Sequence, residues 1–196
     1  MILPIVAYGA PVLKQRAKPI EADYKNLQAL ISNMWETMYA AHGVGLAAPQ
    51  IGLSIRLFVI DTAPFAADDS LTAEERTALE KFKEVFINAT ILDETGEAWD
   101  FNEGCLSIPD IREDVLRNET IQIHYWDQDF KEHTRTFEGL IARVVQHEYD
   151  HIEGILFTDK LSPLKKRLIK RKLTAISQGK IHSEYPMRFP QTKRKR

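Results

Sequence analysis

The sequence predicts an α+β fold in which mostly antiparallel sheets pack around a central helix, with an N-terminal helix and a C-terminal basic helix. Apolar residues recur at helical spacing in three segments, and strand-like runs with alternating apolar residues lie between them. The 196 residues contain no repeats and suit one domain with appendages. We expect one main body over residues 1–162 and a basic amphipathic helix and tail over residues 163–196.

The N-terminal third is predicted to hold one helix and one buried strand. The apolar residues at helical spacing are Leu27, Leu30, Ile31, Met34 and Met38. Gly43 follows them as a stop signal, which predicts a helix over residues 24–42. In the stretch GVGLAAPQIG, residues 43–52, three glycines and a proline argue against a regular element and allow the backbone close to a ligand. The run RLFVI, residues 56–60, predicts a buried strand.

Residues 62–84 are acidic and polar, and Thr72 and Glu75 have the spacing of a capping box, so we expect a short helix or a mobile excursion there. Strand-like runs follow as FINATIL, TIQIHYW and EHTRTFE. The stretch EGLIARVVQHEYDHIEG then has apolar residues at helical spacing and ends at Gly154. This stretch is the central helix of the predicted fold.

The last predicted helix is basic and amphipathic. Ser162 is placed to cap it and Pro163 to occupy its first turn. Its predicted apolar stripe consists of Leu164, Leu168, Ile169, Leu173 and Ile176. Residues 163–196 carry 12 of the 26 Lys+Arg but only one of the 28 Asp+Glu, which leaves 14 basic against 27 acidic residues in 1–162. A basic segment on an acidic body indicates a polyanionic partner.

Composition also indicates a compartment. Cys105 is the single cysteine, so no intrachain disulfide can form, and a reducing compartment is expected. The first eleven residues, MILPIVAYGAP, are apolar but lack a basic leader and are broken by two prolines and a glycine. Neither a signal peptide nor a membrane span is therefore predicted, and the cytoplasm is the expected location.

The stretch QHEYDH contains two histidines four residues apart with a glutamate after the first. On a helix, His147 and His151 project from one face one turn apart and can hold one cation, which makes the central helix a predicted metal-binding helix. Glu148 lies about 100° round the helix from His147, where it suits proton transfer better than ligation.

The third ligand is not obvious from this helix. One group of zinc peptidases places a third histidine where this chain has Phe157, and others use a downstream glutamate where this chain is rich in lysine and arginine. Cys105, in NEGCLSIP, is the remaining strong ligand, in a segment that we expect to break from the strands around it. A small buried apolar side chain is the alternative for a lone cysteine.

Together and in this order, GVGLAAPQIG, EGCLS and QHEYDH resemble the three motifs of the peptide deformylase family, of the bacterial type. The resemblance spans roughly residues 4–162. It implies removal of the formyl group from the N-terminal formylmethionine of nascent polypeptides, with release of formate. It also implies one divalent metal ion held by Cys105, His147 and His151. The family's native ion is usually Fe²⁺, and Ni²⁺, Co²⁺ or Zn²⁺ can replace it.

The resemblance also implies roles for residues around the metal. Glu148 would move the proton from the attacking water to the departing amine, and Gln50 and the Leu106 backbone N–H would stabilise the developing oxyanion. The backbone at Gly45 would pair with the substrate main chain. The methionine side chain would lie against Val44, Leu140 and Val144. We also expect Glu103 to orient nearby loops by charge-assisted hydrogen bonds. Asp150 either does the same from the helix or is a solvated surface charge.

Two other functions stay open at the level of sequence. A zinc endopeptidase could use the same helix, although such enzymes ordinarily recruit histidine or glutamate as the third ligand. An RNA-binding module could use the basic segment and carry a vestigial metal site. Within the deformylase reading, the basic segment is expected to contact the ribosome near the exit of nascent chains, and no membrane partner is expected.

Overall fold

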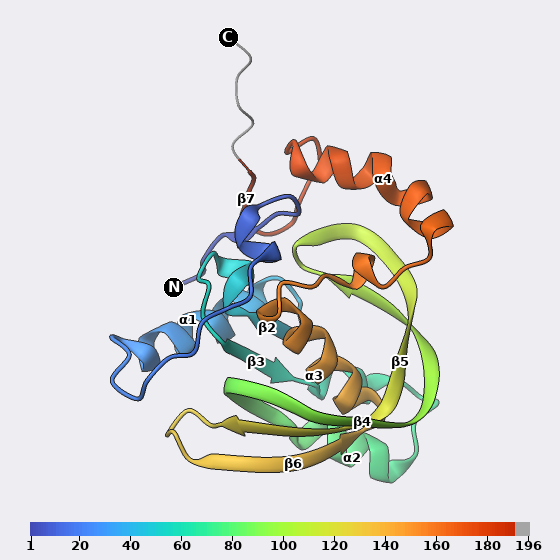
Figure 1. The fold of residues 1–196 in the computed structure, drawn as a ribbon. Helices are drawn as coiled ribbons and strands as arrows, with labels where there is room; N and C mark the ends of the chain where they lie inside the picture. Colours follow the sequence, from blue (N-terminus) through green and yellow to red (C-terminus); the bar gives the residue numbers. More distant parts are fainter. Residues whose placement is uncertain (191–196) are drawn as a thin grey trace.

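A computed structural model describes residues 1–190 of the chain. These residues form a five-stranded antiparallel sheet in the order β2-β3-β4-β5-β6, a two-stranded parallel sheet of β1 and β7, and four α-helices (Figure 1). The strands are β1 (Ile5–Val6), β2 (Gly45–Ala47), β3 (Leu57–Asp61), β4 (Lys83–Cys105), β5 (Ile108–Trp126), β6 (Glu132–Glu138) and β7 (Met187–Arg188). The helices are α1 (Leu27–Ala40), α2 (Ala73–Lys81), α3 (Gly139–Ile152) and α4 (Pro163–Ser177). The predicted α+β class with an antiparallel sheet is confirmed.

The short strand β3 lies between two helices. Its side chains alternate between the faces of the sheet, so that Leu57 and Val59 join a cluster with α1, whereas Phe58 and Ile60 join a cluster with α3. All four side chains are buried. Burial on both faces explains why the run LFVI is continuously apolar. Helix α3 packs against one of these faces and runs through the middle of the molecule (Figure 1).

Strands β4 and β5 form a hairpin much longer than the sequence predicts. The runs FINATIL and TIQIHYW are its buried ends, while most of residues 92–100 are exposed and too polar to read as a strand. The hairpin closes on the pair Cys105 and Ile108, next to a register shift at Gly104. Cys105 is therefore the last residue of β4, and the expectation that its segment breaks from the strands is wrong.

The stretch 43–52 also contains regular structure, contrary to expectation. Residues 45–47 form β2 and pair with residues 58–60 of β3, and residues 48–51 form a 3₁₀ helix that begins with Pro49 in its first turn. Gly43 and Gly52 flank these elements, whereas Gly45 lies in β2 and Pro49 in the 3₁₀ helix. Strand β2 ends the sheet, so its outer backbone edge pairs with no strand among residues 1–190.

The predicted helix over residues 24–42 corresponds to α1, which is shorter at its start because Asn26 adopts a left-handed conformation with φ of 60°. The capping box of α2 is confirmed. Thr72 Oγ1 accepts a hydrogen bond from the Glu75 N–H at 3.2 Å, and the Glu75 carboxylate accepts from the Thr72 N–H at 2.8 Å. The acidic segment 62–84 thus contains an ordered short helix.

The basic helix α4 is capped by Ser162, whose Oγ accepts from the Lys165 N–H at 3.3 Å. Only part of the predicted apolar stripe is buried. The buried members are Ile169, Leu173 and Ile176. Leu164 and Leu168, the first two members of the stripe, are 68% and 71% exposed.

Beyond α4 the chain returns to the body, where β7 pairs with β1 (Figure 1). The end of the predicted basic tail, residues 191–196, lies outside the described residues. No helix within residues 1–190 is long and apolar enough to cross a membrane.

Candidate metal centre and substrate cavity

The structure brings the three predicted metal ligands together. Cys105 ends β4, and His147 and His151 lie one turn apart on α3. One potential ligand atom from each residue lies within 4.8 Å of the others, and Cys105 Sγ is 3.3 Å from His151 Nε2. Burial and the nearby His147 hold the pKa of His151 well below its ordinary value, so its imidazole is neutral, as metal ligation requires. A sulfur and two imidazole nitrogens at these distances fit one late first-row cation.

Glu103 determines which nitrogen of His147 faces the cluster. Burial alone would raise the pKa of the Glu103 carboxyl, but hydrogen bonds from His147 and Arg117 hold that pKa far below its ordinary value. The carboxylate can only accept, so Nδ1 of His147 donates to Glu103 Oε2 at 2.8 Å. Burial would lower the pKa of His147, but hydrogen bonds with Cys105 and Glu103 raise that pKa well above its ordinary value, so a metal binds Nε2 in exchange for the proton there.

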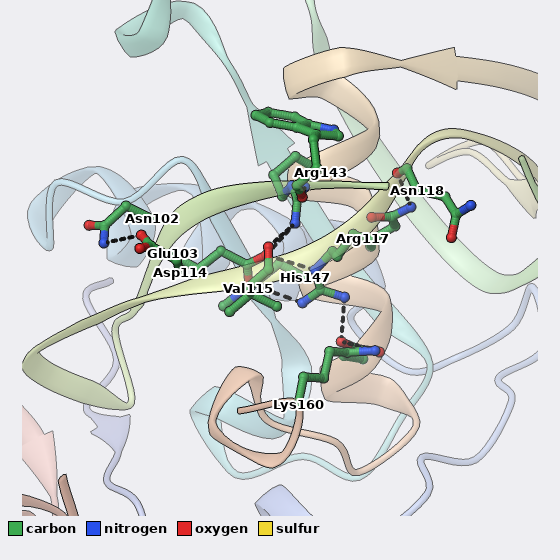
Figure 2. Close-up of polar contacts among 12 residues, drawn as sticks. Asn102, Glu103, Asp114, Val115, Arg117, Asn118, Arg143, His147 and Lys160 are labelled. Carbon is green, nitrogen blue, oxygen red and sulfur yellow. Dashed lines mark hydrogen bonds and ion pairs between the residues drawn. The ribbon is translucent and has the colours of Figure 1, made fainter. Parts of the chain in front are cut away.

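Glu103 is itself held by two buried arginines (Figure 2). Arg117 donates from Nε and Nη2 to the two oxygens of Glu103 at 2.7 and 3.0 Å, and from Nη1 to Asp150 at 2.7 Å. Arg143 donates from Nη1 to Glu103 at 3.1 Å and to the Val115 carbonyl at 2.9 Å. This buried ion network joins the β4–β5 hairpin to α3 at the candidate metal site.

The expectation that Glu103 makes charge-assisted hydrogen bonds is confirmed, but its partners lie on β5 and α3 rather than on loops, and they include the predicted metal ligand His147. For Asp150, the alternative of charge-assisted hydrogen bonds is confirmed and that of a solvated charge is wrong, because Asp150 is 7% exposed and paired with Arg117. Sequence reasoning missed Arg117 and Arg143. Arg143 did leave a signal: it is the one charged residue in the apolar run GLIARVV, where an arginine is rarely buried without a partner.

A cavity of about 410 Å³ opens beside the metal cluster. The predicted site residues that line it are Val44, Gly45, Gln50, Cys105, Leu106, Val144, His147 and Glu148. Phe65, Phe101 and the segment 108–112 extend its wall. Leu140 does not line this cavity, because it lies one turn before Val144 on α3 and therefore farther from the metal ligands.

Glu148 faces the cavity and is only 4% exposed. Burial raises the pKa of its carboxyl to about 7, and Oε2 has no hydrogen-bond partner among the described residues. Gly45 makes room for this side chain, because a Cβ at position 45 would lie 2.7 Å from Cγ of Glu148. The glycine is thus required by packing as well as by any approach of a substrate backbone.

Gln50 is buried with its amide group oriented by two contacts. Its Oε1 accepts from the Ala47 N–H at 2.7 Å, and its Nε2 lies 3.6 Å from Cys105 Sγ. The amide donor therefore points at the metal cluster. Leu106 begins the turn that follows Cys105.

Phe157, which replaces the third histidine of the zinc peptidase pattern, is buried and stacks on His147 with ring centroids 6.2 Å apart. It supports the His147 ring and offers no ligand atom. The endopeptidase arrangement is therefore absent here, where Cys105 occupies the corresponding place in the cluster.

Comparison with known proteins identifies the family. The family model described as polypeptide deformylase matches residues 2–167. The chain is 63% identical to a peptide deformylase of Christiangramia forsetii and 61% identical to one of Flavobacterium johnsoniae, in both cases over the full length of both chains. A crystal structure of a peptide deformylase from Legionella pneumophila is similar with a TM-score of 0.77 and 39% identity, covering 92% of this chain and 98% of that one. The chain belongs to the peptide deformylase family.

Proposed function

We propose that this chain hydrolyses the N-formyl group of N-formylmethionyl nascent peptides and releases formate and a free amine. The observation that carries the proposal is the convergence of Cys105, His147 and His151 on one point beside the buried carboxylate of Glu148. Family membership supports the same reaction. The enzyme would act in the cytoplasm, where nascent chains are made.

Cys105, His147 and His151 would hold one divalent cation, with Fe²⁺ as the proposed ion in the cell and Ni²⁺, Co²⁺ or Zn²⁺ as substitutes. Sulfur with two imidazoles suits all of these late first-row ions. When bound, the cation supplies Lewis-acid activation of water and of the formyl oxygen. The protein's contribution is to hold the three ligand side chains in register through Glu103 and its arginines.

Glu148 is the proposed proton carrier. It lines the cavity, and its Oε2 has no protein partner among residues 1–190, so this oxygen is free to accept a proton from the attacking water. The same carboxyl can then donate the proton to the departing amide nitrogen, which leaves poorly unless it is protonated. Burial favours this exchange because it raises the pKa of the Glu148 carboxyl to about 7, where the group both accepts and donates a proton.

Gln50 Nε2 and the Leu106 N–H are the proposed donors to the oxyanion that develops on the formyl group. The open edge of β2 at Gly45 offers its backbone to an extended peptide, which would add a strand to the sheet. Val44 and Val144 supply the apolar wall for the methionine side chain. Leu140 lies too far along α3 to take part directly, so its proposed contribution is to support Val144.

The reaction is tested by formate release from formyl-Met-Ala-Ser, with acetyl-Met-Ala-Ser as the matched control. Protein purified without oxygen is needed, because a thiolate beside a ferrous ion oxidises readily. We expect rapid turnover of the formyl peptide and at least about 100-fold slower release from the acetyl peptide, whose extra methyl group must be accommodated beside the buried carboxylate. Equal rates on both peptides, or cleavage of internal peptide bonds, would contradict the proposal.

We further propose that residues 163–196 form a docking element for the ribosome. Leu164 and Leu168 are exposed beside lysines and arginines that make the outer face of α4 strongly basic. A basic face attracts ribosomal RNA through its phosphates, and the two leucines add apolar contact area. This proposal rests on charge and exposure together with the family resemblance.

Replacing Arg167, Lys170 and Arg171 by glutamine tests this docking element. We expect at least a tenfold loss of cosedimentation with ribosomes at low salt, because each lost cation removes one phosphate contact. The control replaces Lys18, Lys25 and Lys81, which are equally exposed but lie elsewhere. Removal of α4 itself is a poor test, because Ile169, Leu173 and Ile176 belong to the core. Equal binding by the two triple variants would refute the docking role.

A further inference from the structure

The turn that follows Cys105 accepts hydrogen bonds at both of its carbonyl groups. One donor lies near the N-terminus of the chain and the other in the segment after α4. Residues 106–107 connect β4 to β5 beyond the pair Cys105 and Ile108. The Tyr8 N–H donates to the Ser107 carbonyl at 2.8 Å, and the Tyr185 hydroxyl donates to the Leu106 carbonyl at 2.8 Å. The predicted metal ligand Cys105 directly precedes the turn, and the predicted oxyanion donor, the Leu106 N–H, is in its first residue. The orientation of the turn therefore affects the positions of both groups.

Tyr185 belongs to a segment that is anchored on the body. Directly after it, the Pro186 carbonyl accepts from the Ile5 N–H, and the Arg188 carbonyl accepts from the Ala7 N–H, both at 2.9 Å. These bonds form the parallel pair of β1 and β7. The Tyr185 ring packs against the core cluster that contains α1. The hydrogen bonds between β1 and β7 thus fix the backbone next to Tyr185 and place its hydroxyl at the Leu106 carbonyl.

The same segment also contacts the glycine-rich stretch 43–52. The Arg188 guanidinium lies where a side chain at Gly52 would have to go, and Gly52 itself has a φ of 88°. The C-terminal segment therefore touches both the stretch that carries Gln50 and the turn that carries Leu106. It lies beyond residue 167, where the match to the family model ends.

We propose that Tyr185 is a positioning residue for the deformylase reaction, acting through the Leu106 carbonyl on the placement of the Leu106 N–H and Cys105 Sγ. The inference rests on the proposed function and deepens it. Tyr185 does not line the cavity, so it acts through the turn rather than on the substrate. Its hydrogen bond restrains rotation within Leu106, and a small misplacement of a donor or ligand lowers the rate of the chemical step.

The local contacts of Tyr185 agree with an orienting role. Ser183 Oγ donates to the Tyr185 carbonyl at 3.0 Å and accepts from the Tyr185 N–H at 3.4 Å. These two bonds restrain the backbone of Tyr185 itself. Among the described residues, the Tyr185 hydroxyl has the Leu106 carbonyl as its one protein hydrogen-bond partner. Replacing tyrosine by phenylalanine removes this bond and keeps the ring.

The test compares Tyr185→Phe with Tyr24→Phe in the full-length, metal-loaded protein. Tyr24 flanks the same core cluster, and its hydroxyl makes no hydrogen bond within residues 1–190, so the chemical change is matched. Measurements are kcat and KM on formyl-Met-Ala-Ser, metal content, the melting temperature, and amide hydrogen exchange of residues 104–109. The exchange readout does not depend on activity.

For Tyr185→Phe we expect kcat to fall about three- to tenfold with KM within about twofold, as suits loss of one hydrogen bond that acts on the chemical step. Exchange at residues 106–107 should accelerate in this variant and not in Tyr24→Phe. Unchanged kcat, or unchanged exchange in the turn, overturns the proposal while the wild-type activity still stands. If Tyr185→Phe does not fold, Ser183→Ala replaces it, and unchanged exchange at residues 106–107 then counts against the proposal.

Discussion

Replacing Glu148 by alanine is expected to lower kcat for formyl-Met-Ala-Ser by about 10³-fold while the protein keeps its metal. Two proton transfers are assigned to this carboxyl, and general acid–base catalysis typically contributes about 10²- to 10⁴-fold. The three predicted metal ligands do not include Glu148, so metal analysis should give the wild-type stoichiometry. KM should change little, because the lost interaction belongs to the transition state.

Two further variants make this result specific. Glu148→Gln fills nearly the same volume against Gly45 but cannot carry the proton, so it should be as inactive as alanine. Glu138→Ala, at the exposed start of the same helix, should retain activity. The melting temperature of Glu148→Gln should equal or exceed that of the wild type, because an uncharged amide replaces a buried carboxylate whose Oε2 has no partner among residues 1–190. An active glutamine variant would assign proton transfer to another group.

The features that the sequence predicted well depend on short spacings. The pair His147 and His151 requires only a helix, and the helix follows from its apolar period. The cap of α2 by Thr72 is likewise decided within four residues. The strand 132–138 agrees with β6 at both ends because it pairs regularly with β5.

The features that the sequence did not predict depend on contacts between distant segments. Asp150 reads as a solvated charge until Arg117, 33 positions away, is brought against it. The strand in the glycine-rich stretch forms because β3 supplies a backbone edge, which local composition does not encode. Leu164 has the period of the buried residues on α4 but is exposed, so its environment depends on tertiary packing and not on the period. Tyr185 has no motif at all, and only the return of the chain to β1 gives it a partner.

Replacing Arg117 by methionine is expected to lower the free energy of unfolding by about 3–5 kcal/mol, the typical loss when one partner of a buried ion pair is removed. Arg117 is 7% exposed and makes three of the bonds that neutralise Glu103 and Asp150. Methionine fills much of the volume but leaves these carboxylates short of donors. Urea denaturation of the metal-free protein measures the change. The control, Arg135→Met, breaks an exposed pair with Glu84 and should change stability by less than about 1 kcal/mol.

The same substitution should weaken metal binding, because Glu103 orients His147 and loses two of the four hydrogen bonds that hold it. Loss of such a supporting contact typically lowers metal affinity or activity about 10- to 100-fold. Arg117→Lys separates charge from geometry, since lysine restores a cation but not the paired donors that grip both oxygens of Glu103. Compared with Arg117→Met, the lysine variant can restore the free energy of unfolding without restoring zinc affinity in competition titrations. In that case the positive charge stabilises the fold, and the paired donors of the guanidinium position Glu103 and thereby His147. If Arg117→Met is as stable as the wild type, Arg143 and Lys160 suffice to hold the two carboxylates, and the network does not depend on Arg117.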